Sequence, residues 1–166
     1  MLKLAPFVLA LAIAGAAAAA TTNPPTIAST EDQPAWEASQ QAYLDWNKTQ
    51  AGWTVSPTGI QAHRITPAGK GAHPKPTDMV TINYQAKLIN GTVVDSSYRS
   101  GGPKEFPLPS LIKAWREAVP TMRKGETWEL VVPAEMAYGA RDKTGIPHNS
   151  VLMFQIELID FKAGPQ

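Results

Sequence analysis

Few residues in this chain have types and spacing suited to covalent or metal chemistry. The three histidines, His63, His73 and His148, are far apart in the sequence and lack the spacing of zinc ligands. The absence of cysteine excludes disulfides, thiolate metal sites and a cysteine nucleophile. There is no G-x-S-x-G motif, so the sequence does not indicate a serine hydrolase. We therefore predict that the protein uses neither a metal nor another cofactor.

The remaining candidates are two acids and five aromatic residues. Asp95 and Glu105 could act as a pair of carboxylates, although two acids in loops are more often simply solvated. The aromatic residues occur in elements that could converge on one place: Tyr84, Phe106, Trp115, Tyr138 and Phe154. Periodicity alone favours a role for them in the hydrophobic core, and an apolar binding pocket is the alternative.

The elements that must position these residues are mainly strands. Alternation of apolar and polar residues predicts five of them, at residues 60–65, 80–88, 92–94, 128–132 and 152–158. Asn90-Gly91 is a hairpin signal between the second and the third. Neighbouring strands joined in this way pair antiparallel, so we expect an antiparallel sheet.

One helix and two long loops complete this region. Apolar residues recur at helical spacing from Leu111 to Val119, and Pro109 and Pro120 bracket them. Residues 96–109 and 134–150 show no regular pattern, and loops of this length in a compact domain usually build a site. The prediction is an α+β fold in which an antiparallel sheet of about five strands folds over one short helix.

The first twenty residues read as a secretory signal peptide. Met1-Leu2-Lys3 is a short basic start, residues 4–20 are uncharged, and residues 16–20 are all alanine. Cleavage is expected after Ala20. The alternative is an uncleaved membrane anchor, but the apolar run is shorter than the ~20 residues of a typical span. Export without cysteine favours a bacterial envelope protein, periplasmic or secreted.

Residues 21–57 are predicted to form a flexible leader and a short helix. Thr30-Glu31-Asp32-Gln33 matches a capping box and predicts a helix over 32–50. Trp36, Tyr43 and Leu44 share one stripe of this helix, which favours docking on a neighbouring domain over self-association. We assign residues 58–162 to the principal domain and 163–166 to a tail.

The charge balance excludes one class of partner. The chain has 15 basic and 14 acidic side chains, and loss of Lys3 with the signal would leave it formally neutral. A nucleic-acid-binding domain normally shows a clustered excess of Lys and Arg. We therefore expect no nucleic-acid partner, and no membrane span once the signal is removed.

Six blocks, in order, resemble FKBP-type peptidyl-prolyl cis-trans isomerase domains. They are VTINY at 80–84, GTVVDSSY at 91–98, FPL at 106–108, LIKAW at 111–115, AYG at 137–139, and IP at 146–147 leading to LMF at 152–154. Residues 47–61 and Thr127-Trp128-Glu129 resemble the exported Mip-like branch of this family. That branch agrees with the signal peptide, which was inferred independently.

The resemblance implies the activity, the partners and the site. The implied fold is a sheet of about five strands wrapped around one short helix, and the implied substrates are proline-containing unfolded or nascent exported polypeptides. Asp95 and the Tyr138 hydroxyl are the implied catalytic groups, and the Ile146 N–H is a second implied donor. The implied pocket has Trp115 as its floor, with walls from Tyr84, Val94, Phe106, Leu111, Ile112, Ile146 and Phe154. Immunosuppressive macrolides are a further class of ligand for such a pocket.

Four residues depart from the family pattern. Val94 replaces the usual Phe before the aspartate, Ala114 replaces a common Gly, His148 replaces a second Pro, and Lys104 replaces an aromatic residue. Val94 and Ala114 keep a second function open, namely a weakly catalytic or non-catalytic chaperone that holds unfolded peptides. The dimeric Mip-like proteins carry a long helical arm before the domain, whereas residues 21–58 provide a short one, so we expect a monomer.

Overall fold

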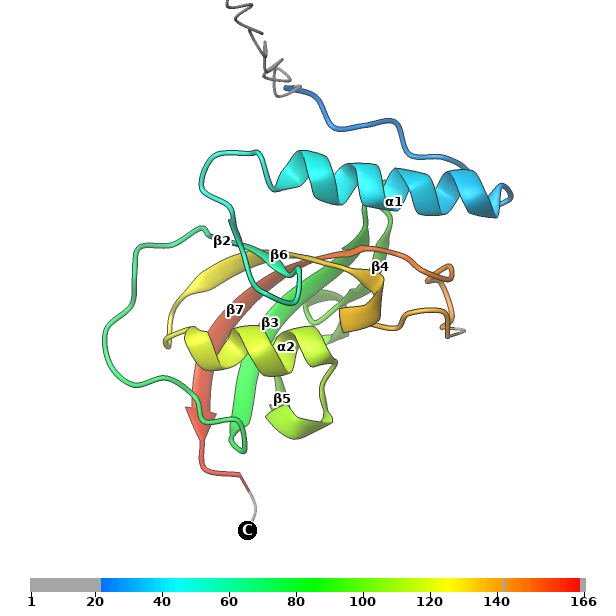
Figure 1. The fold of residues 1–166 in the computed structure, drawn as a ribbon. Coiled ribbons are helices and arrows are strands. Elements are labelled where there is room, and N and C mark those ends of the chain that lie inside the picture. Colours follow the sequence, from blue (N-terminus) through cyan, green and yellow to red (C-terminus); the bar gives the residue numbers. More distant parts are fainter. Residues whose placement is uncertain (1–21, 142, 165–166) are drawn as a thin grey trace, which may run out of the picture.

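The computed structural model describes residues 22–141 and 143–164, so the expected signal peptide lies outside the described residues. Within these ranges the chain forms one sheet of seven strands and two α-helices (Figure 1). In chain order the elements are α1 (Gln33–Asn47), β1 (Thr54–Val55), β2 (Gln61–Arg64), β3 (Met79–Leu88), β4 (Val93–Ser96), β5 (Lys104–Pro107), α2 (Lys113–Ala118), β6 (Thr127–Val132) and β7 (Leu152–Lys162). Short 3₁₀ turns occupy Tyr98–Ser100, Leu108–Ser110, Val119–Thr121 and Ala134–Met136.

The sheet is built around β3. The strand order is β1-β2-β6-β7-β3-β4, and every pairing is antiparallel. β7 pairs with one edge of β3 along its whole length, while β4 and β5 share the other edge. Asp95 lies opposite Ala86, and Phe106 lies opposite Val80. The predicted antiparallel α+β fold is therefore confirmed.

The strand count differs from the expected five because of two short edge segments. β5 lies inside the stretch predicted to be an irregular loop, and it pairs with the first half of β3 through Lys104–Pro107. β1 has only two residues, Thr54 and Val55, both exposed. Neither segment has the length or alternation that marks a strand in a sequence. Both become strands because a neighbouring strand offers them hydrogen-bond partners.

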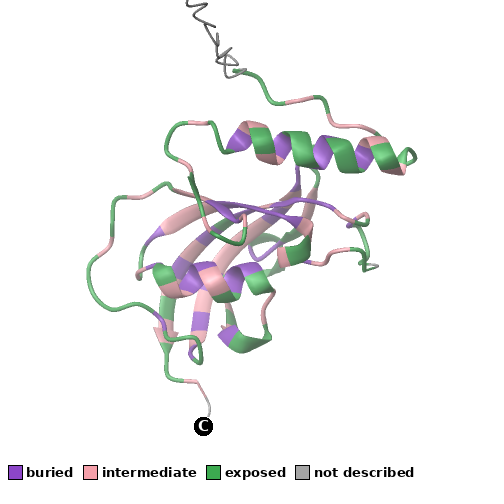
Figure 2. Cartoon of the chain, viewed as in Figure 1, coloured by how far each residue is buried: buried purple, intermediate pink, exposed green. Residues whose placement is uncertain are grey.

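The two faces of the sheet carry separate hydrophobic clusters. Leu130 and Val132 of β6 point into the main core, which includes Trp115 of α2. Val131, between them, points to the opposite face and packs with Tyr43 of α1. The buried residues of the strands and of both helices appear as purple bands in Figure 2. The sheet thus separates α2 on one face from α1 on the other.

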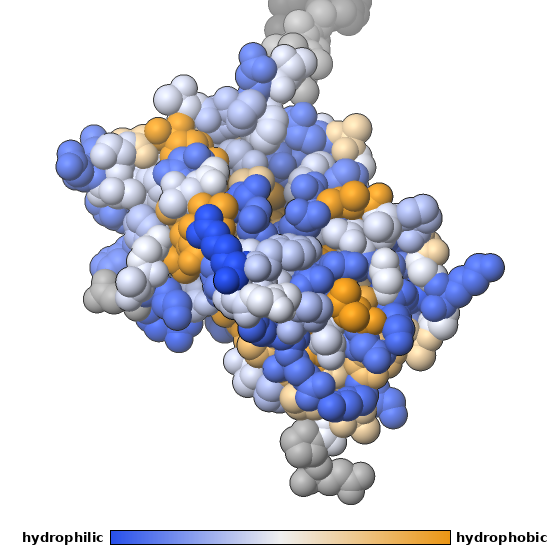
Figure 3. Space-filling view, turned by 180° about the vertical axis from the view of Figure 1, so that it is seen from behind, coloured by the Kyte–Doolittle hydropathy of each residue, from blue (hydrophilic) through white to orange (hydrophobic). Residues whose placement is uncertain are grey.

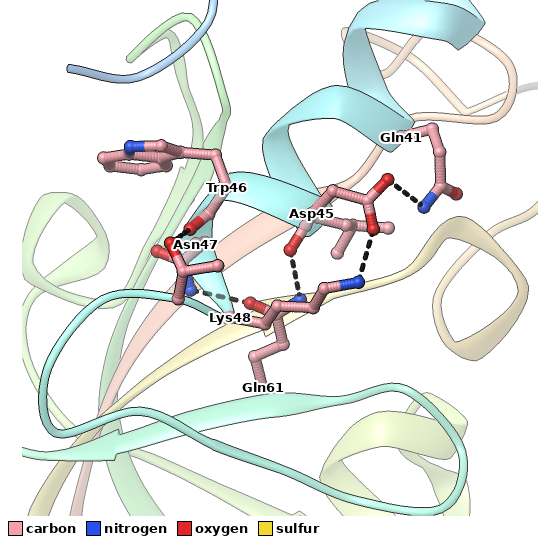
Figure 4. A network of polar contacts seen from close by, with 8 residues as sticks. Gln41, Asp45, Trp46, Asn47, Lys48 and Gln61 are labelled. Atoms are coloured by element: carbon pink, nitrogen blue, oxygen red, sulfur yellow. Dashed lines mark hydrogen bonds and ion pairs between the residues drawn. The ribbon is translucent and has the colours of Figure 1, made fainter. Parts of the chain in front are cut away.

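α1 docks on the domain with a partly polar face. Its N-cap is Asp32, whose Oδ1 accepts a hydrogen bond of 3.1 Å from the Ala35 N–H, so the expected capping box on Thr30 and the bounds 32–50 were wrong. At its other end Asn47 Nδ2 donates to Gln61 Oε1 at 2.8 Å (Figure 4). Gln61 Nε2 in turn donates to the Leu44 carbonyl oxygen at 2.8 Å. These buried bonds tie the C-terminal end of α1 to β2.

Candidate active site

The centre of the site is Trp115 on α2. This helix has six residues, beginning directly after Ile112 and leading into a 3₁₀ turn that contains Pro120. Figure 1 shows α2 lying across the sheet in front of β3 and β7. Ala114 and Trp115 of this helix are buried, and only 5% of Trp115 is exposed. A short helix bounded by prolines therefore holds one large indole against the two central strands.

Aromatic side chains from two strands contact this indole, and a ring from a third strand packs on one of them. The ring centroid of Tyr84 on β3 lies 5.1 Å from that of Trp115, with an interplanar angle of 78°. Phe154 on β7 lies 5.3 Å from Trp115 at 80°. Phe106 on β5 lies 6.3 Å from Tyr84 at 60°. Such edge-to-face pairs stabilise the arrangement beyond the burial of the rings.

These rings form part of a cavity of about 380 Å³. This volume falls within the range of protein sites that bind small molecules or single side chains. The lining residues come from four strands, from α2 and the segment before it, and from the loop 134–150: Tyr84, Ala86, Val94, Asp95, Phe106, Leu111, Ile112, Trp115, Tyr138, Lys143, Thr144, Ile146, Leu152 and Phe154. Most of them are apolar, so the cavity suits an apolar group held beside a few polar atoms.

Asp95 brings a carboxylate to the cavity wall. Its Oδ2 accepts a hydrogen bond of 2.8 Å from the Tyr84 hydroxyl, and its Oδ1 accepts one of 2.8 Å from the Ser96 N–H. Burial raises the pKa of Tyr84, and the hydrogen bond to Asp95 raises it further, well above the usual range. Tyr84 is protonated at neutral pH, as tyrosines ordinarily are, and its hydrogen bond orients the carboxylate of Asp95.

Tyr138 reaches the cavity from the loop that follows β6. Burial raises the pKa of its hydroxyl, the charge of Asp95 raises it further, and Arg141 opposes this in part. The Lys143 Nζ lies 5.5 Å from the centroid of the Tyr138 ring, within the range of a cation–π contact. A tyrosine hydroxyl is already neutral near pH 7 and the shift moves its pKa further from that value, so the Tyr138 hydroxyl can donate a hydrogen bond.

Ile146 contributes its side chain to the cavity, but its N–H is engaged elsewhere. The side chain is buried with 8% of the residue exposed. The backbone N–H donates to the Lys143 carbonyl oxygen at 2.9 Å and closes a tight turn. Donation from this N–H to a substrate would need a shared hydrogen bond or an opening of the turn. The donor role of Ile146 stays a prediction.

The structure brings every residue proposed for the site to one cavity: Tyr84, Val94, Asp95, Phe106, Leu111, Ile112, Trp115, Tyr138, Ile146 and Phe154. Their individual roles in binding and catalysis stay predictions. Four lining residues were missed: Ala86, Lys143, Thr144 and Leu152. Ala86 and Leu152 share the strand alternation of Tyr84 and Phe154, which could have revealed them. No sequence pattern marks Lys143 or Thr144 within their loop.

Other reactive residues are not brought together. Glu105 does not line the cavity, and its Oε2 forms an ion pair of 2.9 Å with Lys162 Nζ. His63 Nδ1 lies 3.5 Å from Glu129 Oε2, and His73 Nδ1 lies 3.0 Å from the Met122 carbonyl oxygen. In residues 22–141 and 143–164, no group of three or more His, Asp or Glu side chains could hold a metal ion. The carboxylate pair considered from the sequence is therefore not formed.

Comparison with known proteins identifies the family. Residues 70–159 match the sequence profile of the family described as FKBP-type peptidyl-prolyl cis-trans isomerase. The chain belongs to the FKBP family. Among FKBP relatives, the peptidyl-prolyl cis-trans isomerase Mip of Coxiella burnetii is 44% identical over 123 residues, which cover 74% of this chain and 53% of that protein. FkpA of Escherichia coli is 39% identical over 130 residues, 78% of this chain and 48% of that one.

Solved FKBP structures agree in fold. The crystal structure of FkpA from Escherichia coli superposes with a TM-score of 0.76 at 39% identity, covering 82% of this chain and 64% of that one. A peptidyl-prolyl cis-trans isomerase from Pseudomonas syringae gives a TM-score of 0.71 at 31% identity, covering 83% of this chain and 99% of that one. The chain spans about half the length of the curated relatives it matches.

The four departures from the FKBP pattern differ in their place in the structure. Val94 lines the cavity, whereas Ala114 is fully buried and does not. Lys104 and His148 also lie outside the lining, and Lys104 Nζ donates to the Ser100 carbonyl oxygen at 2.6 Å. Of the four, Val94 alone alters the wall of the cavity.

Proposed function

We propose that this chain is a peptidyl-prolyl cis-trans isomerase that accelerates rotation about X–Pro bonds while exported polypeptides fold. The observation that carries the proposal is the aromatic cavity with Trp115 as its floor and with Asp95 and Tyr138 in its wall. The proline-containing chains would bind with the prolyl ring over Trp115. The same cavity would accept an immunosuppressive macrolide. Membership of the FKBP family supports this assignment.

The chemistry of the reaction suits such a cavity. Rotation about a peptide bond meets a barrier of ~18–20 kcal/mol because resonance is lost, and unaided isomerisation takes tens to hundreds of seconds. The planar amide is more charge-separated than the twisted one. An apolar cavity therefore disfavours the planar ground state relative to the transition state. A difference of ~5 kcal/mol corresponds to about 4,000-fold in rate.

The polar groups orient the peptide in this proposal. The neutral Tyr138 hydroxyl donates to a substrate carbonyl oxygen, which fixes one side of the rotating bond. The carboxylate of Asp95, held by the Tyr84 hydroxyl at 2.8 Å, provides a fixed charge in the same wall. Rotation breaks no covalent bond in the substrate, so the reaction needs no nucleophile.

The proposal is tested by a protease-free isomerisation assay on a short Leu-Pro peptide. We expect the protein to accelerate isomerisation, and Tyr138→Phe and Asp95→Ala to lower kcat/KM by about 10-fold each. For Tyr138 that factor corresponds to the ~1.4 kcal/mol of one hydrogen bond made in the transition state. For Asp95 it reflects the loss of the fixed charge and of the hydrogen bond to Tyr84. Tyr98→Phe is the matched control, because Tyr98 is 55% exposed and does not line the cavity. A folded wild-type protein without acceleration would refute the proposal.

A second function, a chaperone that holds peptides without isomerising them, is motivated by Val94. A smaller side chain in the wall leaves the cavity less aromatic while keeping its floor. Such a chaperone would depend on exposed apolar surface and would tolerate loss of Asp95. On the face shown in Figure 3, hydrophobic residues form small separate patches among hydrophilic ones. Across the described residues the exposed large apolar side chains are Val55, Ile65 and Tyr98, which favours the isomerase over the chaperone.

The proposed location is the bacterial envelope, reached through a signal peptide at residues 1–20, with a monomeric mature protein. A relative in Legionella longbeachae, 43% identical over 127 residues, is named outer membrane protein MIP. Within residues 22–141 and 143–164 no helix has the length and hydropathy needed to cross a membrane. α1 buries Trp36 and Tyr43 against its own domain, which favours a monomer.

Native mass spectrometry of the protein purified from its own cells tests the removal of residues 1–20 and the monomeric state. We expect one species with the mass of a single chain that begins at Thr21. The physical reason is that the apolar face of α1 is already covered within one chain. A dimer that persists on dilution, or a chain that retains residues 1–20, would contradict the corresponding statement.

A further inference from the structure

The N-terminal half of α1 is hydrogen-bonded to the end of the loop that lines the cavity. Trp36 Nε1 donates to the His148 carbonyl oxygen at 3.2 Å. Asn149 Nδ2 donates to Glu37 Oε1 at 2.6 Å. The Val151 N–H donates to Gln40 Oε1 at 3.0 Å. Three residues on α1 thus hold three of four successive positions of the chain, 148, 149 and 151.

This contact is buried at Trp36 and Gln40, whereas the bond between Glu37 and Asn149 lies at its exposed edge. Trp36 is 1% exposed and Gln40 is 4% exposed, so water does not readily replace their partners. Asn149 adopts a left-handed backbone conformation with φ of 53°, which is uncommon for a residue other than glycine. Asparagine adopts this conformation more readily than other non-glycine residues. The bond from its side chain to Glu37 adds a second link between this position and α1.

The same segment is joined to both polar and apolar walls of the cavity. The Asn149 N–H donates to the Gly139 carbonyl oxygen at 2.9 Å, directly beside Tyr138. The residues before His148 include Ile146, which lines the cavity. Ile146 is two residues before His148, and Tyr138 is the neighbour of Gly139. A shift of residues 148–151 would therefore displace both side chains.

We infer that Trp36, Glu37 and Gln40 are positioning residues of the isomerase site, which makes α1 part of the catalytic unit. None of the three lines the cavity, so they act through the loop 139–151. This inference rests on the proposed function. Molecules in which this loop is displaced cannot bind the peptide. The apparent affinity is therefore the intrinsic affinity multiplied by the fraction of molecules in which the loop is in position.

Gln40→Ala and Asn47→Ala form a matched pair that tests this inference. Both side chains are buried on α1, and each holds the helix through a side-chain hydrogen bond to another element. Figure 4 shows that the Asn47 bond reaches Gln61 on β2. Trp36→Phe is a second test variant, because it keeps a ring but removes the donor to His148. All are assayed well below their melting temperatures.

We expect Gln40→Ala and Trp36→Phe to lower kcat/KM by about 3- to 10-fold, through a higher KM, with little change in kcat. Amide hydrogen exchange should accelerate in residues 139–151. Asn47→Ala should lower the melting temperature without either effect. Equal kcat/KM and equal exchange in Gln40→Ala and Asn47→Ala would overturn the inference.

A variant that does not fold and a wild-type protein without activity still leave a comparison that tests the inference. If Gln40→Ala does not fold, Trp36→Phe is compared with Asn47→Ala in its place. A wild-type protein that does not isomerise the peptide refutes the proposed function. In that case hydrogen exchange still decides whether α1 holds the loop, and unchanged exchange in residues 139–151 would overturn the inference.

Discussion

Replacing Trp115 by alanine is expected to lower the free energy of unfolding by about 3–5 kcal/mol and to remove peptide binding. The indole is 5% exposed and meets the rings of Tyr84 and Phe154 edge-on, so its loss leaves a cavity in the core. The same change removes the floor of the binding cavity. Urea unfolding measures the first effect, and peptide titration at low temperature measures the second.

Trp115→Phe separates the two roles of the side chain. It keeps a ring against Tyr84 and Phe154, and it removes a buried Nε1–H that has no hydrogen-bond partner in the described part of the chain. We expect a smaller loss of stability than for alanine, together with weaker peptide binding. Trp53→Ala is the control, since Trp53 packs on the opposite face of the sheet. Wild-type stability and affinity in Trp115→Ala would contradict the assignment of Trp115 as floor and core.

Glu126 is the most deeply buried acid of the described residues and is the second position with a large expected effect. It is 1% exposed. Its Oε1 accepts from the Gly69 N–H at 2.7 Å, and its Oε2 accepts from the Arg123 N–H at 3.1 Å and from Trp128 Nε1 at 2.9 Å. One carboxylate thus joins the loop after β2 to the start of β6.

These three donors set the pKa of Glu126. Burial raises it, but the hydrogen bonds from Gly69, Arg123 and Trp128 lower it by more, so the pKa lies below its ordinary value of 4.5. A carboxyl whose pKa is lower in the folded state stabilises the protein above its unfolded pKa. This contribution is lost as the pH falls through the folded pKa. Acid should therefore loosen the loop around Gly69.

We expect Glu126→Gln to lower the free energy of unfolding by about 2–4 kcal/mol at pH 7. Its amide NH₂ cannot accept hydrogen bonds, so at least one buried donor loses its partner. The difference from wild type should shrink below pH 4, because the wild-type carboxyl is then being protonated. Urea unfolding at pH 7 and at pH 3 measures both.

Glu129→Gln is the control for Glu126→Gln. The side chain of Glu129 is 44% exposed, and its Oε2 lies 3.5 Å from His63 Nδ1. Exposed pairs of this kind contribute about 0–1 kcal/mol. Equal effects of the two substitutions at pH 7 would show that the buried network around Glu126 does not stabilise the fold.

Strand alternation predicted the centre of the fold well. Val80, Ile82, Ala86 and Leu88 are all buried on one face of β3, as their spacing predicts. Alternation works here because one face of each strand meets the core and the other does not. It failed for β5, where Lys104–Pro107 is a strand only because it pairs with β3. The capping-box pattern failed for the beginning of α1, where Asp32 rather than Thr30 caps the helix.

By itself, the sequence determined the family, the antiparallel α+β fold and the ten residues that meet in the cavity. The fold followed from strand alternation, which depends on local spacing, whereas the family and the ten residues were implied by the resemblance of six blocks to FKBP domains. Tertiary structure alone decided which hydrogen bonds those residues make. The Ile146 N–H is engaged by Lys143, three donors surround Glu126, and α1 holds residues 148–151. The partners of a polar group are chosen by what lies nearby after folding, and Gln40 and Val151 meet only then.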